Sequence, residues 1–193
     1  MTHLADRAAF FTSIRGKLGP FTKEQVAGFD RILNAIDGAP LSHQAYMLAT
    51  PWHETDKTMQ PVREAFRLSE AWRKKNLRYW PWYGRGDVQL TWRPNYVVAD
   101  AALAKAGLIK AGELIANPDL AMRPDISAFI LRHGMTNGWF TGKKLSSYLP
   151  AEGVATRDQY IQARRIINIL DKADLVEDYA QIFERGLRAG GAR

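Results

Sequence analysis

Apolar residues recur at steps of three and four along most of this 193-residue chain, and that spacing predicts helices. The first such stretch, residues 4–18, carries Leu4, Phe11, Ile14 and Leu18 on one face. Further helices are expected over 69–76, 95–107, 110–116, 124–133, 143–149, 157–170 and 173–188. No linker, repeat or low-complexity stretch divides the sequence, so we expect residues 1–193 to form a single domain.

Two more helices are predicted from their end signals. Thr22 followed by Gln25 matches a capping box, in which side chains satisfy backbone groups at a helix start. The helix that it opens is expected to end at 37–38, an Asp-Gly pair. Ser42 is expected to cap the next helix, which runs to Glu54. Pro51 lies inside that helix and is expected to kink it near its end.

One stretch in the middle of the chain breaks the helical pattern. Residues 87–92 alternate polar and apolar side chains, which is typical of a half-buried strand. Because successive side chains of a strand point to opposite faces, we expect Val88, Leu90 and Trp92 to face the core. Asp87, Gln89 and Thr91 are then expected on the opposite face. The expected fold is therefore mainly α (α+β), with many helices and a small β element that lines a cleft.

Composition excludes several kinds of chemistry. The chain has no cysteine, which removes disulfides, thiolate catalysis, zinc fingers and iron–sulfur clusters. Its four histidines lack metal-ligand spacing, and no Gly-x-Ser-x-Gly motif is present. We therefore expect no metal and no cofactor. No apolar run is long enough for a membrane span, and the start of the chain lacks the pattern of a secretory signal.

The charge balance favours an anionic partner. There are 27 basic and 20 acidic residues, a net charge of +7. Seven basic and two acidic residues lie between positions 63 and 85. Such a run is either a solvated face or a surface for nucleic acid, a membrane or an acidic polymer such as a bacterial wall. No helix-turn-helix or RNA-binding motif is present, so we do not expect a nucleic-acid partner.

Five large rings border this basic run: Tyr79, Trp80, Trp82, Tyr83 and Trp92. Aromatic rings stack on the apolar faces of sugars, and their polar edges bind hydroxyl groups. A satellite hydrophobic core is the alternative interpretation. The two tryptophans that flank Pro81 favour a carbohydrate site, because a core role is less natural in a proline-containing loop.

Two carboxylates could carry acid–base chemistry. Glu54 ends a mostly apolar helix beside Trp52, where partial desolvation would favour its protonated form and suit a general acid. Glu64 lies ten residues on, beside Arg63 and Arg67, whose charges would favour the ionised form of a general base. The alternative is that Glu54 is only a helix-end carboxylate and that Glu64 pairs with a neighbouring arginine.

The residues His53-Glu54-Thr55, followed by Tyr-Gly-Arg-Gly-Asp-Val-Gln-Leu-Thr-Trp at 83–92 and Asn95-Tyr96, resemble glycoside hydrolase family 19. That family contains chitinases and related phage and prophage endolysins. A weaker likeness continues at 117–120 and 166–168. The resemblance implies a lysozyme-like, mainly α fold, in agreement with the periodicity.

The resemblance also implies roles for individual residues. Glu54 would be the general acid and Glu64 the general base, with Glu70 a competitor for the second role. Thr91 would help to hold the catalytic water. Substrate-contacting positions are matched by Gln89, Asn95, His53, Tyr83 and Asn168. Pro51, Asp56 and Asp87 depart from the family pattern and leave the shape of the cleft open.

The sequence thus predicts a peptidoglycan-degrading endolysin that hydrolyses β-1,4 bonds between amino sugars with inversion. We expect a monomer made in the cytoplasm of a host bacterium, which reaches the wall once the membrane is permeabilised. A chitinase with the same carboxylates is the nearest alternative. A non-catalytic wall-binding module is a third hypothesis, and a helical nucleic-acid-binding protein is the least favoured.

Overall fold

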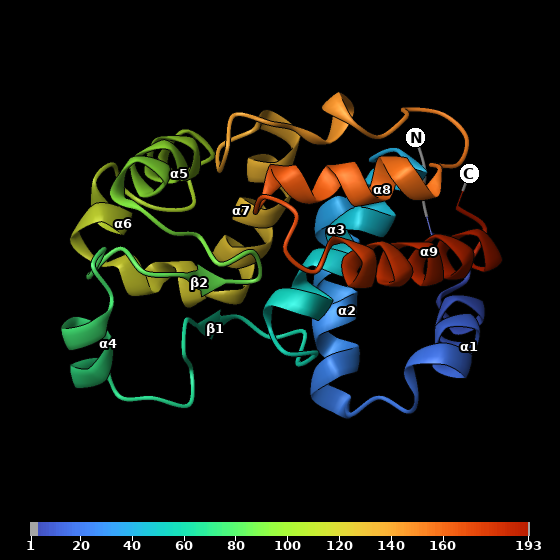
Figure 1. The fold of residues 1–193 in the computed structure, drawn as a ribbon, viewed down its shortest axis with the longest axis horizontal. Coiled ribbons are helices and arrows are strands. Elements are labelled where there is room, and N and C mark those ends of the chain that lie inside the picture. The colour runs from blue at the N-terminus through green and yellow to red at the C-terminus, as the bar shows by residue number, and fades with distance from the viewer. Residues whose placement is uncertain (1–3, 193) are drawn as a thin grey trace.

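The structure is a computed structural model that describes residues 4–192, and it is mainly helical (Figure 1). In chain order the elements are α1 (Arg7–Leu18), α2 (Lys23–Ile36), α3 (Leu41–Glu54), β1 (Val62–Arg63), α4 (Glu70–Asn76), β2 (Arg85–Gly86), α5 (Arg93–Lys105), α6 (Glu113–Ala116), η1 (Pro118–Met122), α7 (Pro124–Asn137), η2 (Leu145–Ser147), α8 (Arg157–Ala163), η3 (Arg164–Ile166) and α9 (Ala173–Ala189). The elements marked η are short 3-10 helices.

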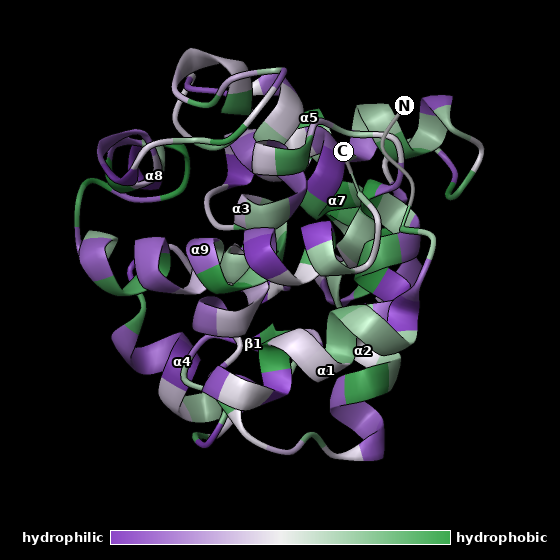
Figure 2. Ribbon diagram, turned by 90° about the vertical axis from the view of Figure 1, so that its right-hand side faces the viewer, coloured by the Kyte–Doolittle hydropathy of each residue, from purple (hydrophilic) through white to green (hydrophobic). Residues whose placement is uncertain are grey.

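Helix α3 lies at the centre of the core. Every residue from Leu41 to Trp52 is buried, and α3 packs most extensively against α9, which also contacts α1 and α8. A helix that is covered on all sides needs small or apolar residues around most of its circumference, which α3 supplies. Its buried polar side chains, such as Gln44 and Thr50, donate to backbone carbonyls. Helix α9 is amphipathic instead, with hydrophilic and hydrophobic residues alternating along it (Figure 2). The acidic end of α3, Glu54, is thereby fixed by the most tightly packed part of the molecule.

The helix-start signals are partly confirmed. The capping box at Thr22 and Gln25 is formed, with both reciprocal hydrogen bonds present. Ser42 was wrongly predicted as a cap: α3 starts after Pro40, and the Ser42 hydroxyl donates to the carbonyl of Pro150 at 2.7 Å. Pro51 lies inside α3, which continues to Glu54.

Several helices are shorter than the periodicity predicts. Helix α1 begins at Arg7 rather than at residue 4, because Asp6 accepts from the amide of Ala9 and caps it there. Helix α6 begins only after Gly112, whose φ of 83° is unsuited to a helix. The stretch 143–149 contains only a short 3-10 turn, and α8 ends at Ala163 before another one.

The strand predicted over 87–92 is wrong. The sheet has two short antiparallel strands, β1 and β2, with Val62 opposite Gly86 and Arg63 opposite Arg85. Residues 87–92 start with a tight turn, which is closed by two hydrogen bonds between Arg85 and Leu90. Positive φ angles rule out an extended strand over 87–92: they occur at Gln89 (52°) and Trp92 (72°), and also at Gly86 (83°) just before this stretch.

The turn nevertheless buries some of the predicted core residues. Val88 and Leu90 are buried, but Trp92 is 45% exposed and Asp87 is fully buried. Asp87 is held by Arg31 of α2, whose two terminal nitrogens donate to its carboxylate at 2.6 and 2.8 Å. The hydroxyl of Ser127 in α7 donates to the same carboxylate at 2.6 Å. A buried carboxylate therefore fixes the turn to two helices of the core.

Among residues 4–192, no helix is both long and apolar enough to cross a bilayer.

Candidate active site

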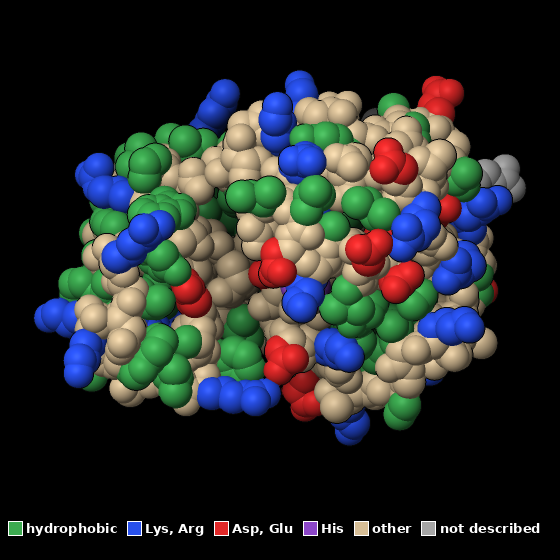
Figure 3. Space-filling view, viewed as in Figure 1, with side chains coloured by type: hydrophobic (Ala, Val, Ile, Leu, Met, Phe, Trp, Pro, Cys, Tyr) green, Lys and Arg blue, Asp and Glu red, His purple; other side chains and the backbone are tan. Residues whose placement is uncertain are grey.

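A cavity of about 490 Å³ lies beside the turn over 87–92. The surface is hollowed between the side of the molecule that carries α5 and the side that carries α3 and α9 (Figure 3). The cavity is lined by Glu54, Glu64, Tyr79, Val88, Gln89, Thr91, Trp92, Asn95, Phe140, Thr141, Ile167 and Asn168. Six of the eight site residues predicted from the sequence are brought together here: Glu54, Glu64, Gln89, Thr91, Asn95 and Asn168.

Glu54 enters the cavity from the C-terminal end of α3, and its side chain is 16% exposed. The side chain is largely shielded from solvent, as expected, but its neighbour is a cation that the sequence argument did not predict. The guanidinium of Arg164 donates from Nη1 to Glu54 Oε1 at 2.7 Å and from Nε to the carbonyl of Asp171 at 2.9 Å. Arg164 is itself 2% exposed. The carboxylate is therefore held at one oxygen by a buried cation, which fixes its direction.

Glu64 follows strand β1 and faces the same cavity. Its Oε1 accepts from the hydroxyl of Tyr79 at 2.6 Å, and its Oε2 accepts from the backbone N–H of Gly84 at 2.9 Å. Its own backbone N–H donates to the carbonyl of Gly84 at 2.7 Å. Both carboxylate oxygens are therefore oriented by donors from the 79–84 segment.

The arginines predicted to accompany Glu64 have other partners. Arg63 pairs with Asp119 at 2.8 Å, and Arg67 pairs with Asp56 at 2.9 Å. Glu64 lies in the turn just after β1, where its carboxylate is directed toward Tyr79 and Gly84, so adjacency along the chain does not place Arg63 beside it.

Tyr79 is a site residue whose role the sequence argument missed. Burial and the hydrogen bond to Glu64 raise the pKa of Tyr79 to about 12, so the phenol stays protonated and remains a donor at neutral pH. Its ring lies 4.7 Å from the ring of Trp92, which also lines the cavity. The cluster of rings in the sequence indicated a site, but it could not indicate which ring holds the carboxylate.

Three polar side chains brace the turn that forms one wall of the cavity. The amide of Gln89 donates to the carbonyls of Val62 and Gly86 at 2.9 and 3.1 Å. Thr91 Oγ1 donates to the carbonyl of Gln89 at 2.7 Å, and the amide of Asn95 donates to the carbonyl of Thr91 at 3.0 Å. The Gln89 amide and the Thr91 hydroxyl use their donors within the protein, which leaves the hydroxyl lone pairs of Thr91 to accept from a water or a ligand.

Two predicted site residues do not line this cavity. Tyr83 is 1% exposed, and its hydroxyl donates to Glu70 at 2.7 Å. Its ring lies 3.6 Å from the guanidinium carbon of Arg85. His53 precedes Glu54 on α3, and burial lowers its pKa, although the charge of Glu54 acts in the opposite direction.

Glu70, the competitor for the second carboxylate role, lines a different cavity. It accepts from the indole N–H of Trp80 at 2.8 Å and from the hydroxyl of Tyr83. Burial opposes its ionisation, but these hydrogen bonds and the nearby Arg73 outweigh burial and lower its pKa. Of the two candidates, Glu64 is the one that shares a cavity with Glu54.

Much of the basic run is engaged inside the protein. Four of its arginines pair with carboxylates: Arg63, Arg67, Arg73 and Arg85. Arg85 is 4% exposed and also donates to the carbonyls of Pro81 and Tyr83 and to the hydroxyl of Tyr96. The run therefore supports the loops around the cavity more than it forms a free cationic surface.

Within the described part of the chain, no three His, Asp or Glu side chains lie close enough together to hold a metal ion. Comparisons with protein-family models, curated proteins and solved structures found no match to this chain.

Proposed function

We propose that this protein is a glycoside hydrolase that cleaves β-1,4 bonds between the amino sugars of peptidoglycan with inversion. The observation that carries the proposal is the placement of Glu54 and Glu64, from separate elements, in the wall of one open cavity. Paired carboxylates across a cleft are the usual equipment of glycosidases, and inverting enzymes leave room between them for a water. The motif that resembles glycoside hydrolase family 19 supplies several of the other residues in that wall.

Glu54 acts as the general acid in this proposal. Its carboxylate is paired with Arg164 in the free protein, so it takes up a proton from solvent before the step. It then transfers this proton to the glycosidic oxygen as the bond to the anomeric carbon breaks, so the leaving sugar departs as a neutral alcohol. The carboxylate that remains on Glu54 is then paired with Arg164 at 2.7 Å. Because this pairing is strongest once the proton has left, Arg164 favours the later part of the step over its start.

Glu64 acts as the general base. A water attacks the anomeric carbon from the face opposite the leaving group, and Glu64 takes one of its protons as the new C–O bond forms. Tyr79 and the N–H of Gly84 fix the direction of the carboxylate. The hydroxyl of Thr91 lies in the same wall and supplies a further acceptor for that water.

The remaining lining suits a neutral sugar. Amide and hydroxyl groups of Gln89, Thr91, Asn95 and Asn168 line the cavity together with the rings of Tyr79 and Trp92. Neutral hydrogen-bonding groups pair with sugar hydroxyl and acetamido groups, and rings cover the apolar faces of sugar units.

The test is the release of reducing ends from purified peptidoglycan by the wild type, Glu54→Gln and Glu64→Gln. Each substitution is expected to lower turnover about 10²- to 10⁴-fold, because each removes a proton-transfer group. Glu152→Gln, in an exposed loop, is the matched control and should retain wild-type turnover.

An inactive wild type, or an active Glu54→Gln variant, would contradict the proposal. Loss of turnover in Glu70→Gln but not in Glu64→Gln would show that the base is misassigned. Soluble chitin oligomers provide the comparison with the chitinase alternative, because they share the amino-sugar backbone but carry no peptide. Faster cleavage of chitin than of peptidoglycan would favour that alternative.

A further inference from the structure

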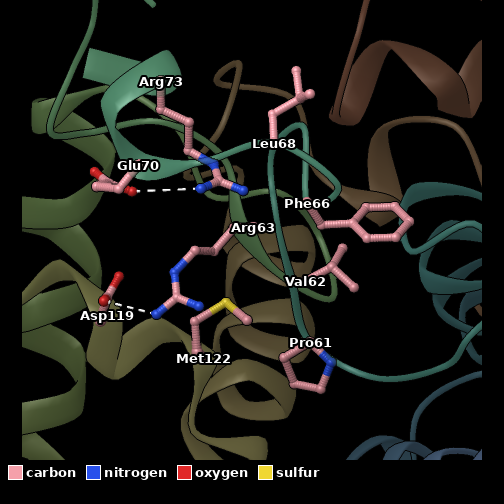
Figure 4. A pocket seen from close by; sticks show the side chains of 9 residues that line it. All are labelled: Pro61, Val62, Arg63, Phe66, Leu68, Glu70, Arg73, Asp119 and Met122. Atoms are coloured by element: carbon pink, nitrogen blue, oxygen red, sulfur yellow. Dashed lines mark hydrogen bonds and ion pairs between the residues drawn. The ribbon is translucent and has the colours of Figure 1, made fainter.

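The groove does not end at the two carboxylates. A second cavity of about 440 Å³ shares Glu54, Glu64 and Gln89 with the catalytic cavity. A third, of about 460 Å³, shares lining residues with the second: Val62, Arg63, Phe66 and Leu68. The three hollows therefore follow one another along the 61–68 segment. We call the third hollow, which is shown in Figure 4, the side chamber.

The side chamber has a different chemistry from the catalytic cavity. It is lined by Pro61, Val62, Arg63, Phe66, Leu68, Glu70, Arg73, Asp119 and Met122. Its polar groups are guanidinium and carboxylate groups, whereas those of the catalytic cavity beyond Glu54 and Glu64 are amides and hydroxyls. Charged groups beside aliphatic surface suit a ligand that is itself charged and partly apolar, and they suit a neutral sugar poorly.

Three of the four charged groups of the side chamber keep access to solvent. In the pair between Arg63 and Asp119 the side chains are 39% and 46% exposed. Glu70 is 54% exposed and lies 3.5 Å from Arg73, whose side chain is only 5% exposed (Figure 4). An ion pair as exposed as that of Arg63 with Asp119 contributes little to stability, so Arg63 can exchange Asp119 for an anionic group of a ligand at small cost. Asp119 itself stays paired with the buried Arg85 at 2.7 Å.

Two apolar side chains complete the surface. Phe66 and Leu68 are each 43% exposed on the loop between β1 and α4. Phe66 and Leu68 line both the side chamber and the cavity that leads from it to Glu54 and Glu64. Exposed apolar groups beside a groove mark a contact site when they form a patch with polar groups around it.

We propose that the side chamber binds the short peptide that branches from the glycan strand of peptidoglycan. Such stems carry both carboxylate and ammonium groups on short aliphatic side chains, which matches arginines, acidic residues and apolar surface in one chamber. This inference rests on the proposed function and deepens it, because it assigns to the peptide a part of the groove that a chitin chain does not require.

The test compares two substrates: glycan strands that carry short peptide stems, and the same strands after an amidase has removed the stems. The wild type is expected to have the higher kcat/KM on the stem-bearing strands. Phe66→Ser and Leu68→Ser are each expected to lower the ratio of the two kcat/KM values about tenfold, or about 1.4 kcal/mol. Val154→Ser, which removes a 52% exposed apolar side chain that lines none of these hollows, should leave the ratio unchanged.

A second measurement does not depend on the variants. The free stem peptide, added to the wild type, is expected to inhibit cleavage of stem-bearing strands competitively and to inhibit Leu68→Ser less. A ratio that is the same in the wild type and both serine variants would overturn the inference while leaving the proposed function intact. Cleavage of neither substrate by the wild type would instead overturn the proposed function.

Discussion

The contact between Arg164 and Glu54 gives the sharpest prediction about how the site is built. The two residues are 110 positions apart in the sequence, and the guanidinium is 2% exposed. Replacement of Arg164 by Gln keeps a polar side chain but removes the charge. It also removes the donors to Glu54 and to the carbonyl of Asp171.

The loss of stability depends on the Glu54 carboxylate, which the substitution leaves without its cationic partner. Hydrogen bonds to charged groups contribute about 1.5–3 kcal/mol each, and breaking a buried ion pair costs about 3–5 kcal/mol. Because Glu54 keeps 16% exposure, some of its solvation returns, and we expect a loss at the lower end, about 3 kcal/mol. For a chain of this length that corresponds to a fall in Tm of about 6–12 °C.

The assay is urea unfolding followed by tryptophan fluorescence for the wild type, Arg164→Gln, Glu54→Gln and the double variant. In the double variant neither side chain is charged, so no buried charge is left unpaired. Its loss of stability should therefore be smaller than the sum of the two single losses, with a coupling free energy of at least about 1.5 kcal/mol. Arg67→Gln, which breaks the exposed pair with Asp56, is the control and should not shift the midpoint measurably. Additive effects of the two single changes, within about 0.5 kcal/mol, would refute the contact.

Other predictions concern the turn, a helix and a histidine. A Cβ on Gly84 would lie 2.7 Å from Gln89 Oε1, and the Gln89 side chain is held in place because its amide donates to two carbonyls. Gly84→Ala should therefore lower the free energy of unfolding in urea by about 1–3 kcal/mol, and it should lower turnover at least about tenfold. Gly16→Ala, in α1 with nothing within 4 Å, should instead raise stability by about 0.5–1 kcal/mol, and a loss would contradict the helix. Burial lowers the pKa of His43 below its ordinary value, so the unfolded chain binds the proton more readily and stability should fall as pH drops below about 6.5. The urea midpoint between pH 7.5 and pH 5 should fall less in His43→Gln than in the wild type, and equal falls would assign the effect to other groups.

The helical part of the fold could be predicted because its signals are local. Apolar spacing and the Thr22 capping box depend on residues within a few positions of one another, and the structure has helices at both. The exact ends were less predictable, because they depend on tertiary contacts. Helix α6, for example, begins where the carboxylate of Asp100 accepts from the amides of Gly112 and Leu114.

The stretch over 87–92 shows how a local pattern misleads. Alternation of Val88 and Leu90 fits a strand, but the same spacing arises in a turn whose positive φ angles point both side chains into the core. Burial of Asp87 depends on Arg31, which lies 56 residues away, and a single sequence gives no sign of that pairing. Trp92 lies after this turn, directly before α5, and is 45% exposed.

The sequence predicted which residues form the candidate site better than it predicted the charged and polar groups that contact them. The predicted residues Glu54, Glu64 and Thr91 meet in one cavity, two of them from the short motifs and Glu64 from between these motifs. The groups that orient the carboxylates, Arg164 and Tyr79, come from outside the short motifs. Their roles are set by tertiary placement, which neither charge counts nor ring counts reveal.

The most direct test of the two-carboxylate account is the configuration of the newly formed reducing end. Proton NMR within minutes of adding the wild type to soluble peptidoglycan fragments resolves the anomer before it equilibrates. Attack by a water activated by Glu64, opposite a leaving group protonated by Glu54, predicts that the α anomer forms first from a β-1,4 bond. Initial formation of the β anomer, or of an anhydro end with no water added, would contradict the account.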